Sequence, residues 1–376
     1  MSNYWNNRVK NLSPYIPGEQ PREKQFIKLN TNENPYPPSP KVLEAIQQVL
    51  SAGPSAGDRL RLYPDPECRE LREAVAARYG VKYGQVFAGN GSDEVLAFAF
   101  GAFFNSDSHT AIPPSGRRIL FPDITYSFYP VYAGLWDVPF RTVPVREDFS
   151  IDYKEYLVPA GGVIFPNPNA PTGRALPPDE ILRIAAYQEK QKKVLIVDEA
   201  YAAFGAAIYG ALSVVSAIDE HPNLLTVHTL SKSASLAGLR VGFAIGNEGL
   251  IEGLCRIRDG FNSYTVDRLA QAGAAAAIRD TAYYDGITQK VIATRELAAS
   301  VLRKMDFTVI PSGANFLFIR SPKKSGPELF AALRERGILV RHFNKPRIAD
   351  FLRVSIGTDK DMDTFLAACI EIEDRE

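Results

Sequence analysis

A lysine at the end of an apolar run is the residue whose surroundings point most directly to chemistry. Lys232 lies in the segment TLSKSASLAGLRVGF, residues 229–243, directly after the apolar run 224–227. A lysine held among small residues at a strand end, away from bulk water, can form an imine with a carbonyl compound. Taken alone, however, most such lysines are solvated surface residues.

An acid follows a second apolar run in the segment VLIVDEAY, residues 194–201. Ligands of parallel α/β sheets bind at the carboxyl ends of the strands, so Asp198 is placed where a buried carboxylate could pair with a ring nitrogen and keep it protonated. Tyr201 could reach the same ligand. The alternatives are an acid in a loop or a carboxylate for magnesium, but the latter needs a GxxxxGK[ST] loop, which the chain lacks.

Two further segments are candidates for loops that bind a ligand. NGSDE, residues 90–94, precedes an apolar helical run, so that Gly91, Ser92 and Asp93 begin a helix whose free N–H groups favour a phosphate. A plain helix cap is the alternative. NPNAPTG, residues 167–173, follows a predicted strand and is too rich in Pro and Gly for regular structure. By itself it is equally compatible with an ordinary loop.

The combination and order of these residues match the needs of pyridoxal 5'-phosphate. Ser92, Ser231 and Arg240 would take the phosphate and Tyr126 would stack on the ring. Asp198 would pair with the pyridinium nitrogen, while Lys232 would hold the aldehyde.

The elements that must position these residues indicate an α/β fold. Strand 163–165, helix 177–193 with one apolar face, and strand 194–197 form a strand, helix, strand unit. Continuously apolar strands separated by helices predict a mostly parallel sheet covered by helices on both faces. We therefore predict a large cofactor-binding domain over residues 41–265.

The two ends of the chain differ from this pattern. Residues 1–40 are rich in Pro and Asn and predict an ordered arm that joins the small domain. Residues 266–376 predict a smaller α+β domain, with strands at 316–319 and 351–356 and helices at 327–336 and 360–372.

Composition excludes several classes of protein. The 376 residues carry 43 Lys plus Arg and 43 Asp plus Glu, so no net charge attracts nucleic acid or a membrane surface. Three widely spaced cysteines and four scattered histidines give neither a disulfide framework nor a metal site, and we expect no metal. Neither a signal segment nor a transmembrane run is evident, so we expect a cytoplasmic protein.

On these residues the chain resembles the fold-type I pyridoxal-phosphate aminotransferases, and within them the histidinol-phosphate aminotransferase branch. The resemblance covers nearly the whole length. Its marks are NLSPY at 11–15, LNTNENPYPP at 29–38, RLYPDP at 61–66, NGSDE at 90–94, TYSFY at 125–129, PNAPTG at 168–173, DEAY at 198–201, TLSKSASLAGLRVGF at 229–243 and LRVSIGT at 352–358.

The resemblance implies roles for individual residues. Lys232 would form the aldimine with the cofactor and move a proton between substrate Cα and cofactor C4′. Asp198 and Tyr201 would bind the ring nitrogen and the phenolic oxygen. The phosphate would be held by Gly91, Ser92, Ser231 and Arg240, together with Tyr63 of the neighbouring subunit in a homodimer, and Asp93 would also lie among the cofactor-binding residues.

The resemblance also places the substrate. It implies that Arg353, Arg341, Tyr15 and Asn32 bind it, with arginines for its anionic groups. In one place the chain departs from the family. Many members carry an asparagine immediately before PTG that bonds the phenolic oxygen, whereas this chain has Ala170 there. Either Asn169 takes this role or Tyr201 acts alone.

The implied activity is transfer of the amino group of L-histidinol phosphate to 2-oxoglutarate by a ping-pong mechanism. Two alternatives share the fold: an aminotransferase for aromatic amino acids and a threonine-phosphate decarboxylase. A non-catalytic regulatory protein with this fold is a third alternative. It would ordinarily carry an added DNA-binding segment, for which this chain leaves no space, and partners beyond small molecules and a second copy are not expected.

Overall fold

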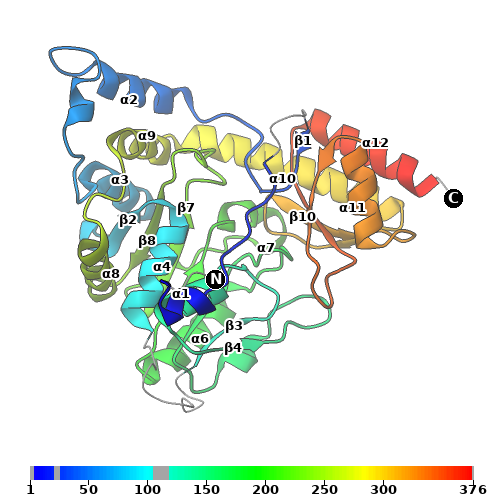
Figure 1. Ribbon diagram of the computed structural model, residues 1–376, viewed down its shortest axis with the longest axis horizontal. Coiled ribbons are helices and arrows are strands. Elements are labelled where there is room, and N and C mark those ends of the chain that lie inside the picture. Colours follow the sequence, from blue (N-terminus) through cyan, green and yellow to red (C-terminus); the bar gives the residue numbers. More distant parts are fainter. Residues whose placement is uncertain (1–3, 21–25, 105–117, 375–376) are drawn as a thin grey trace.

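The computed structural model describes residues 4–20, 26–104 and 118–374 (Figure 1). Its centre is a seven-stranded sheet in which only β8 runs against its neighbours β2 and β7. The strand order is β2 (Val86–Gly89), β8 (Gly242–Gly246), β7 (Leu224–Thr229), β6 (Leu195–Asp198), β5 (Gly162–Pro166), β3 (Ile119–Pro122) and β4 (Phe140–Val143). The predicted mostly parallel sheet is confirmed.

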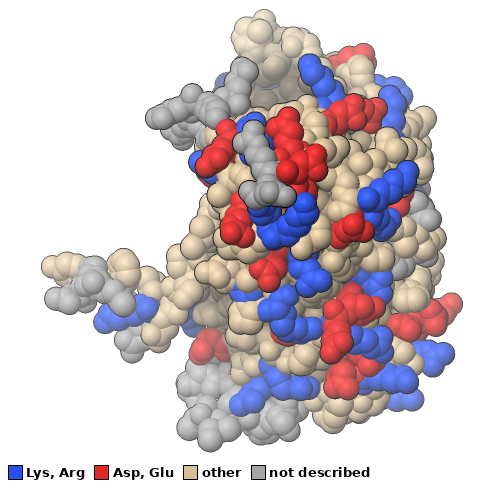
Figure 2. All heavy atoms as spheres, turned by 90° about the vertical axis from the view of Figure 1, so that its right-hand side faces the viewer, with Lys and Arg blue, Asp and Glu red and all other residues tan. Residues whose placement is uncertain are grey.

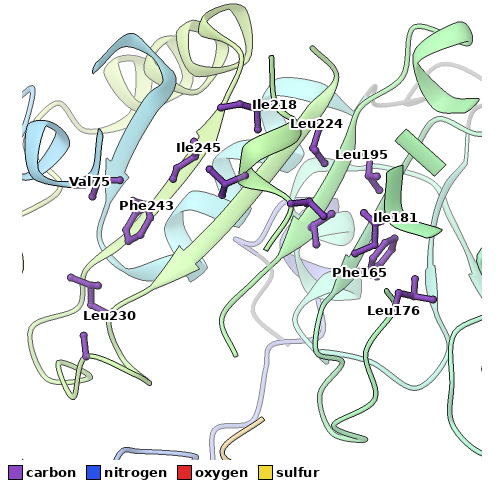
Figure 3. Packing of buried hydrophobic residues seen from close by; sticks show 14 of the residues in the cluster. Val75, Phe165, Leu176, Ile181, Leu195, Ile218, Leu224, Leu230, Phe243 and Ile245 are labelled. Carbon is purple, nitrogen blue, oxygen red and sulfur yellow. The ribbon is translucent and has the colours of Figure 1, made fainter. Parts of the chain in front are cut away.

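Helices cover both faces of this sheet because successive residues of each strand point to opposite sides. In β6, Leu195 and Val197 pack into one buried cluster and Ile196 into the other. The first face, drawn in Figure 3, is covered by α3 (Arg69–Tyr79), α6 (Pro178–Lys190) and α9 (Arg268–Arg279). The second is covered by α4 (Gly91–Phe103), α5 (Tyr129–Trp136) and α8 (Glu248–Phe261).

A second, antiparallel sheet lies beside the first, with the strand order β12 (Arg341–His342), β13 (Leu352–Ser355), β10 (Phe316–Arg320) and β9 (Thr308–Ile310). Its own core joins it to α11 (Gly326–Glu335) and α12 (Asp359–Asp374). The long helix α10 (Thr281–Lys304) runs between the two sheets (Figure 1). This part matches the predicted elements of a small α+β domain, although the exact boundaries at 40 and 265 remain a prediction.

The N-terminal arm crosses between the two parts. It holds the short helix α1 (Asn7–Asn11) and β1 (Ile27–Lys28), which pairs in parallel with β11 (Ile338–Leu339). Helix α2 (Pro40–Ser51) then packs on α9. The remaining short helices are α7 (Ala206–Tyr209) and the single turns 58–61, 83–85, 153–156, 202–204 and 215–217.

The predicted helix 177–193 is shorter in the structure, because α6 ends at Lys190 and Lys192 has a left-handed backbone with φ of 56°. Among the described residues, no helix is long and apolar enough to cross a membrane. On the face formed around α11 and α12, Figure 2 shows basic and acidic side chains interspersed.

One close backbone contact fixes the start of α4. A side chain at Gly242 in β8 would overlap the backbone of Gly91 and Ser92. Gly242→Ala should therefore lower the free energy of unfolding by roughly 1–3 kcal/mol, measured by urea denaturation.

The matched control is Gly286→Ala in α10, where an added methyl meets no atom within 4 Å. This change should raise stability by up to about 1 kcal/mol, because alanine has the higher helix propensity. Equal effects of the two substitutions would contradict the role of the β8–α4 contact.

Candidate active site

The side chain of Lys232 lies in a cavity of about 350 Å³ at the carboxyl ends of β6 and β7. Its Nζ donates to the Thr31 carbonyl at 3.1 Å. The Asn34 side chain donates to the Lys232 carbonyl at 3.1 Å. The N-terminal arm thus holds the lysine from across the cavity.

Asp198 forms a buried wall of the cavity at the last position of β6. Its carboxylate accepts hydrogen bonds from the Tyr129 hydroxyl at 3.3 Å and the Ala200 amide at 3.1 Å. Burial raises the pKa of Asp198 to about 7. A cationic N–H partner inside the cavity would offset this desolvation.

The next residue, Glu199, faces the other side of the sheet. Its Oε1 accepts from the Val214 amide at 2.8 Å, and it lines a separate cavity with His228. Burial raises the pKa of Glu199 to about 7 as well. Because side chains alternate along a strand, only Asp198 of this acidic pair faces Lys232.

An anion cradle lies at the first turn of α4. Gly91 has φ of 79°, and a Cβ there would meet the Arg240 guanidinium at 2.7 Å. Ser92, Ser231 and Arg240 all line the cavity, with Arg240 Nη1 at 3.5 Å from Ser231 Oγ. Two hydroxyls, a guanidinium and the free N–H groups of a helix start together suit a phosphate.

Asp93 lines the cavity, and its carboxylate is hydrogen-bonded to neighbouring side chains. Its carboxylate accepts from Arg240 Nη2 at 3.0 Å and from the Tyr126 hydroxyl at 2.7 Å. A carboxylate would repel a phosphate, so Asp93 serves to orient the guanidinium and the aromatic ring.

Asn32 joins the site through Tyr201. Both residues line the cavity, and Asn32 Nδ2 donates to the Tyr201 hydroxyl at 3.0 Å. Asn32 was predicted to bind substrate, but in the structure its side chain bonds to protein on both sides, since Oδ1 accepts from Ser355 Oγ at 2.8 Å.

A half-buried arginine, Arg353, faces the cavity from the small-domain sheet. Arg353 donates to the Asn30 carbonyl at 3.0 Å, and its Nε has no hydrogen-bond partner among the described residues. The guanidinium carbon lies 5.4 Å from the centre of the Phe316 ring and 5.6 Å from that of Phe343. Burial lowers the pKa of Arg353, so an anionic ligand would relieve an unbalanced charge.

Four of the predicted residues do not line this cavity, namely Gly91, Asn169, Arg341 and Tyr63, although Gly91 lies against the Arg240 guanidinium, which does. Asn169 is buried, and its carboxamide bonds the Ile124 carbonyl at 2.8 Å and the Thr125 and Thr172 hydroxyls at 3.0 and 3.2 Å. These bonds turn it away, and Ala170 lines the cavity instead.

Arg341 lines a neighbouring cavity of about 640 Å³. Its guanidinium donates to the Ile16 and Pro17 carbonyls at 3.3 and 3.5 Å. Tyr15 stacks on Phe128 with ring centres 4.3 Å apart and lines both cavities. The arm therefore separates Arg341 from Lys232.

Tyr63 is 78% exposed and stacks on Tyr264 with ring centres 4.6 Å apart. It does not line the cavity of its own chain.

Sequence reasoning missed Tyr129, Thr31 and Asn34, whose contacts hold Asp198 and Lys232. Tyr129 stands three residues after Tyr126 at the start of α5, and this spacing could have placed both near one ligand. The Thr31 contact uses a backbone carbonyl, for which a sequence carries no signal.

These residues fit pyridoxal phosphate. The cavity offers an anion cradle, a buried carboxylate for a protonated ring nitrogen and the amine of Lys232. Among the described residues, no group of three or more His, Cys, Asp or Glu side chains could hold a metal ion.

Comparison with known proteins agrees with this site. The pattern of the family described as aminotransferase class I and II matches residues 24–368. The chain is 54% identical over 375 residues to histidinol-phosphate aminotransferase 1 of Bordetella parapertussis, covering 99% of each chain. It is 50% identical to the histidinol-phosphate aminotransferase of Aromatoleum aromaticum, again over 99% of both.

A similar solved structure is histidinol-phosphate aminotransferase from Sinorhizobium meliloti in complex with pyridoxal-5'-phosphate. It has a TM-score of 0.83 at 23% identity and covers 99% of this chain and 98% of that one. Aspartate aminotransferase of Thermus thermophilus has a TM-score of 0.80 at 18% identity, which shows the shared fold. The chain belongs to the class I and II aminotransferase family, as an enzyme whose cofactor is pyridoxal 5'-phosphate.

Proposed function

We propose that the enzyme transfers the amino group of L-histidinol phosphate to 2-oxoglutarate. The observation that carries this proposal is one cavity that joins the amine of Lys232, the buried carboxyl of Asp198 and the half-buried side chain of Arg353. Relatives named histidinol-phosphate aminotransferase, 50–54% identical over 99% of the chain, support the choice of amino donor.

The cofactor would be held by residues of the large sheet. Ser92, Ser231, Arg240 and the amides at the start of α4 bind its phosphate. Asp198 holds the proton on the ring nitrogen, and Tyr201 donates to the phenolic oxygen. When bound, the cofactor supplies an electron sink for the electron pair left at substrate Cα.

Lys232 would move the proton. Its Nζ lies at the Thr31 carbonyl inside the cavity, and a free amine there can take a proton from substrate Cα and return it to the cofactor carbon C4′. A neutral amine is needed for this step.

The two arginines would receive the anionic groups of the substrates. Arg353 already faces the cavity without a carboxylate partner among the described residues. Within the described ranges, the Arg341 guanidinium donates only to the carbonyls of Pro17 and Ile16 in the arm, at 3.5 and 3.3 Å. We propose that Arg341 and Tyr15 bind the substrate phosphate, since guanidinium binds phosphate in bidentate fashion more strongly than it binds a neutral carbonyl.

A homodimer would complete the site. An exposed apolar patch is formed by the stacked rings of Tyr63 and Tyr264 with the chain neighbours Leu60 and Leu62, and Phe261, three residues before Tyr264, is exposed as well. Exposed patches of this kind mark association surfaces. We propose that a second copy covers this patch and that Tyr63 reaches the cofactor phosphate of that copy. We also propose that the enzyme works in the cytoplasm, in keeping with three unpaired cysteines.

A half-reaction tests the amino donor. The protein loaded with pyridoxal phosphate should lose its visible band on mixing with histidinol phosphate and regain it with 2-oxoglutarate. Lys232→Ala should lower the rate by at least about 100-fold. Conversion by phenylalanine but not by histidinol phosphate would indicate the aromatic branch. Release of carbon dioxide from threonine phosphate would indicate the decarboxylase.

Subunit complementation tests the shared site. Lys232→Ala and Tyr63→Ala proteins should each have little activity, but a reassociated 1:1 mixture contains heterodimers with one intact site. Random pairing then restores about a quarter of the wild-type activity. No recovery, with dimers present by sedimentation, would show that Tyr63 does not act across the interface.

The buried carboxyl predicts a dependence of stability on pH. The pKa of Asp198 rises from 3.8 to about 7 on folding. In cofactor-free protein its stabilising contribution is therefore complete below pH 4 and is lost as the pH rises to about 7. Asp198→Asn should flatten this slope by up to about 1.4 kcal/mol per pH unit in urea unfolding.

Glu199→Gln is the matched control, since the pKa of Glu199 is also raised to about 7. It should flatten the same slope while retaining cofactor affinity, because Glu199 faces away from Lys232. Loss of cofactor affinity in both variants would contradict the distinct role of Asp198.

A further inference from the structure

The direction of the hydrogen bonds around Asn32 is fixed by its neighbour Ser355. The Asn32 amide N–H donates to Ser355 Oγ at 2.8 Å, and the Ser355 hydroxyl donates to Asn32 Oδ1 at 2.8 Å. The carbonyl side of the carboxamide thus faces Ser355. Its NH₂ side faces Tyr201 and donates to the hydroxyl at 3.0 Å.

This arrangement determines what the Tyr201 hydroxyl can do. An amide NH₂ group only donates, so Tyr201 accepts from Asn32 and keeps its own proton for another acceptor. Within the described part of the chain, no residue accepts that proton from Tyr201. Since Tyr201 lines the cavity with Lys232, the O–H group is left to donate to a ligand there.

Asn32 is itself rigidly held. It is 1% exposed and has φ of 58°, a left-handed conformation that asparagine tolerates better than most residues. The main-chain carbonyl of Asn32 accepts a hydrogen bond from Asn315 Nδ2 at 3.0 Å. Asn315 and Ser355 belong to the small-domain sheet region, whereas Tyr201 follows β6 of the large sheet. The bond between Asn32 and Tyr201 therefore joins the two parts.

The alanine before Pro171 makes the bond between Asn32 and Tyr201 more important. Ala170 lines the cavity with a methyl group, and the carboxamide of Asn169 is turned into the protein. No carboxamide from that loop assists Tyr201.

We infer that Asn32 is a positioning residue of the reaction, which makes the Tyr201 hydroxyl a hydrogen-bond donor to the phenolic oxygen of the cofactor. This inference rests on the proposed cofactor contact of Tyr201 and extends it to a residue of the N-terminal arm. Asn32 acts through Tyr201 and is assigned no direct contact with substrate.

The test is Asn32→Asp, measured in cofactor-loaded protein without substrate. Aspartate keeps the shape, tolerates the left-handed backbone and still accepts from Ser355. It replaces the NH₂ donor with an acceptor that captures the Tyr201 proton. The phenolic oxygen then loses its donor, and the nitrogen contributed by Lys232 keeps its proton to higher pH. The pH midpoint of the visible band should rise by about one unit or more.

Asn315→Asp is the control for charge, since it makes the same chemical change one hydrogen bond further from Tyr201. The pH midpoint of the visible band of Asn315→Asp should shift by less than a third of the shift in Asn32→Asp. In a Tyr201→Phe background, Asn32→Asp should add little to the shift that Tyr201→Phe causes alone. Asn32→Gly, which removes the donor without charge or backbone strain, should shift the midpoint in the same direction if the aspartate variant does not fold.

Equal shifts in Asn32→Asp and Asn315→Asp would overturn the inference, because they would report charge alone. A shift in Tyr201→Phe with none in Asn32→Asp or Asn32→Gly would also overturn it, while leaving the proposed function intact. Absence of a visible band from loaded wild-type protein would instead overturn the proposed function, and the inference with it.

Discussion

The burial of the Asp198 carboxyl at the end of β6 is the interaction on which the site depends. Burial at this position is unfavourable for a charge unless a cationic partner fills the cavity beside it. The sheet, the helices on both faces and the arm together keep water from this carboxyl. In the proposed function, the same enclosure would keep the ring nitrogen of a bound cofactor protonated, so one packing constraint would serve both cofactor affinity and chemistry.

The sequence was sufficient for those parts of the site that follow a strand or begin a helix. Lys232, Asp198 and Ser92 are placed by the rule that ligands meet the carboxyl ends of parallel strands, and α/β periodicity locates those ends. The strand, helix and second strand between residues 162 and 198 could be predicted as well, because two short apolar runs flank a segment with one apolar face. Boundaries were less certain, as the left-handed Lys192 beyond α6 shows.

Contacts between distant segments could not be predicted in the same way. Whether Asn169 or Ala170 faces the cavity depends on how one loop turns, which the composition of that loop does not determine. Arg341 lies in the neighbouring cavity with Tyr15, and this placement depends on the path of the arm across both sheets. Asn32 was recognised as a site residue, but its partner Tyr201 lies 169 positions away, and no local pattern connects them.

The attachment of Asn32 to Ser355 and Asn315 has a consequence for biosynthesis. The arm leaves the ribosome long before the groups that fix Asn32, which lie 323 and 283 positions later in the chain. The large sheet can assemble earlier, since its strands end at Gly246. A nascent chain can therefore form the anion cradle well before its arm is anchored, so the part of the cavity wall that the arm supplies is completed only after Ser355 has been made.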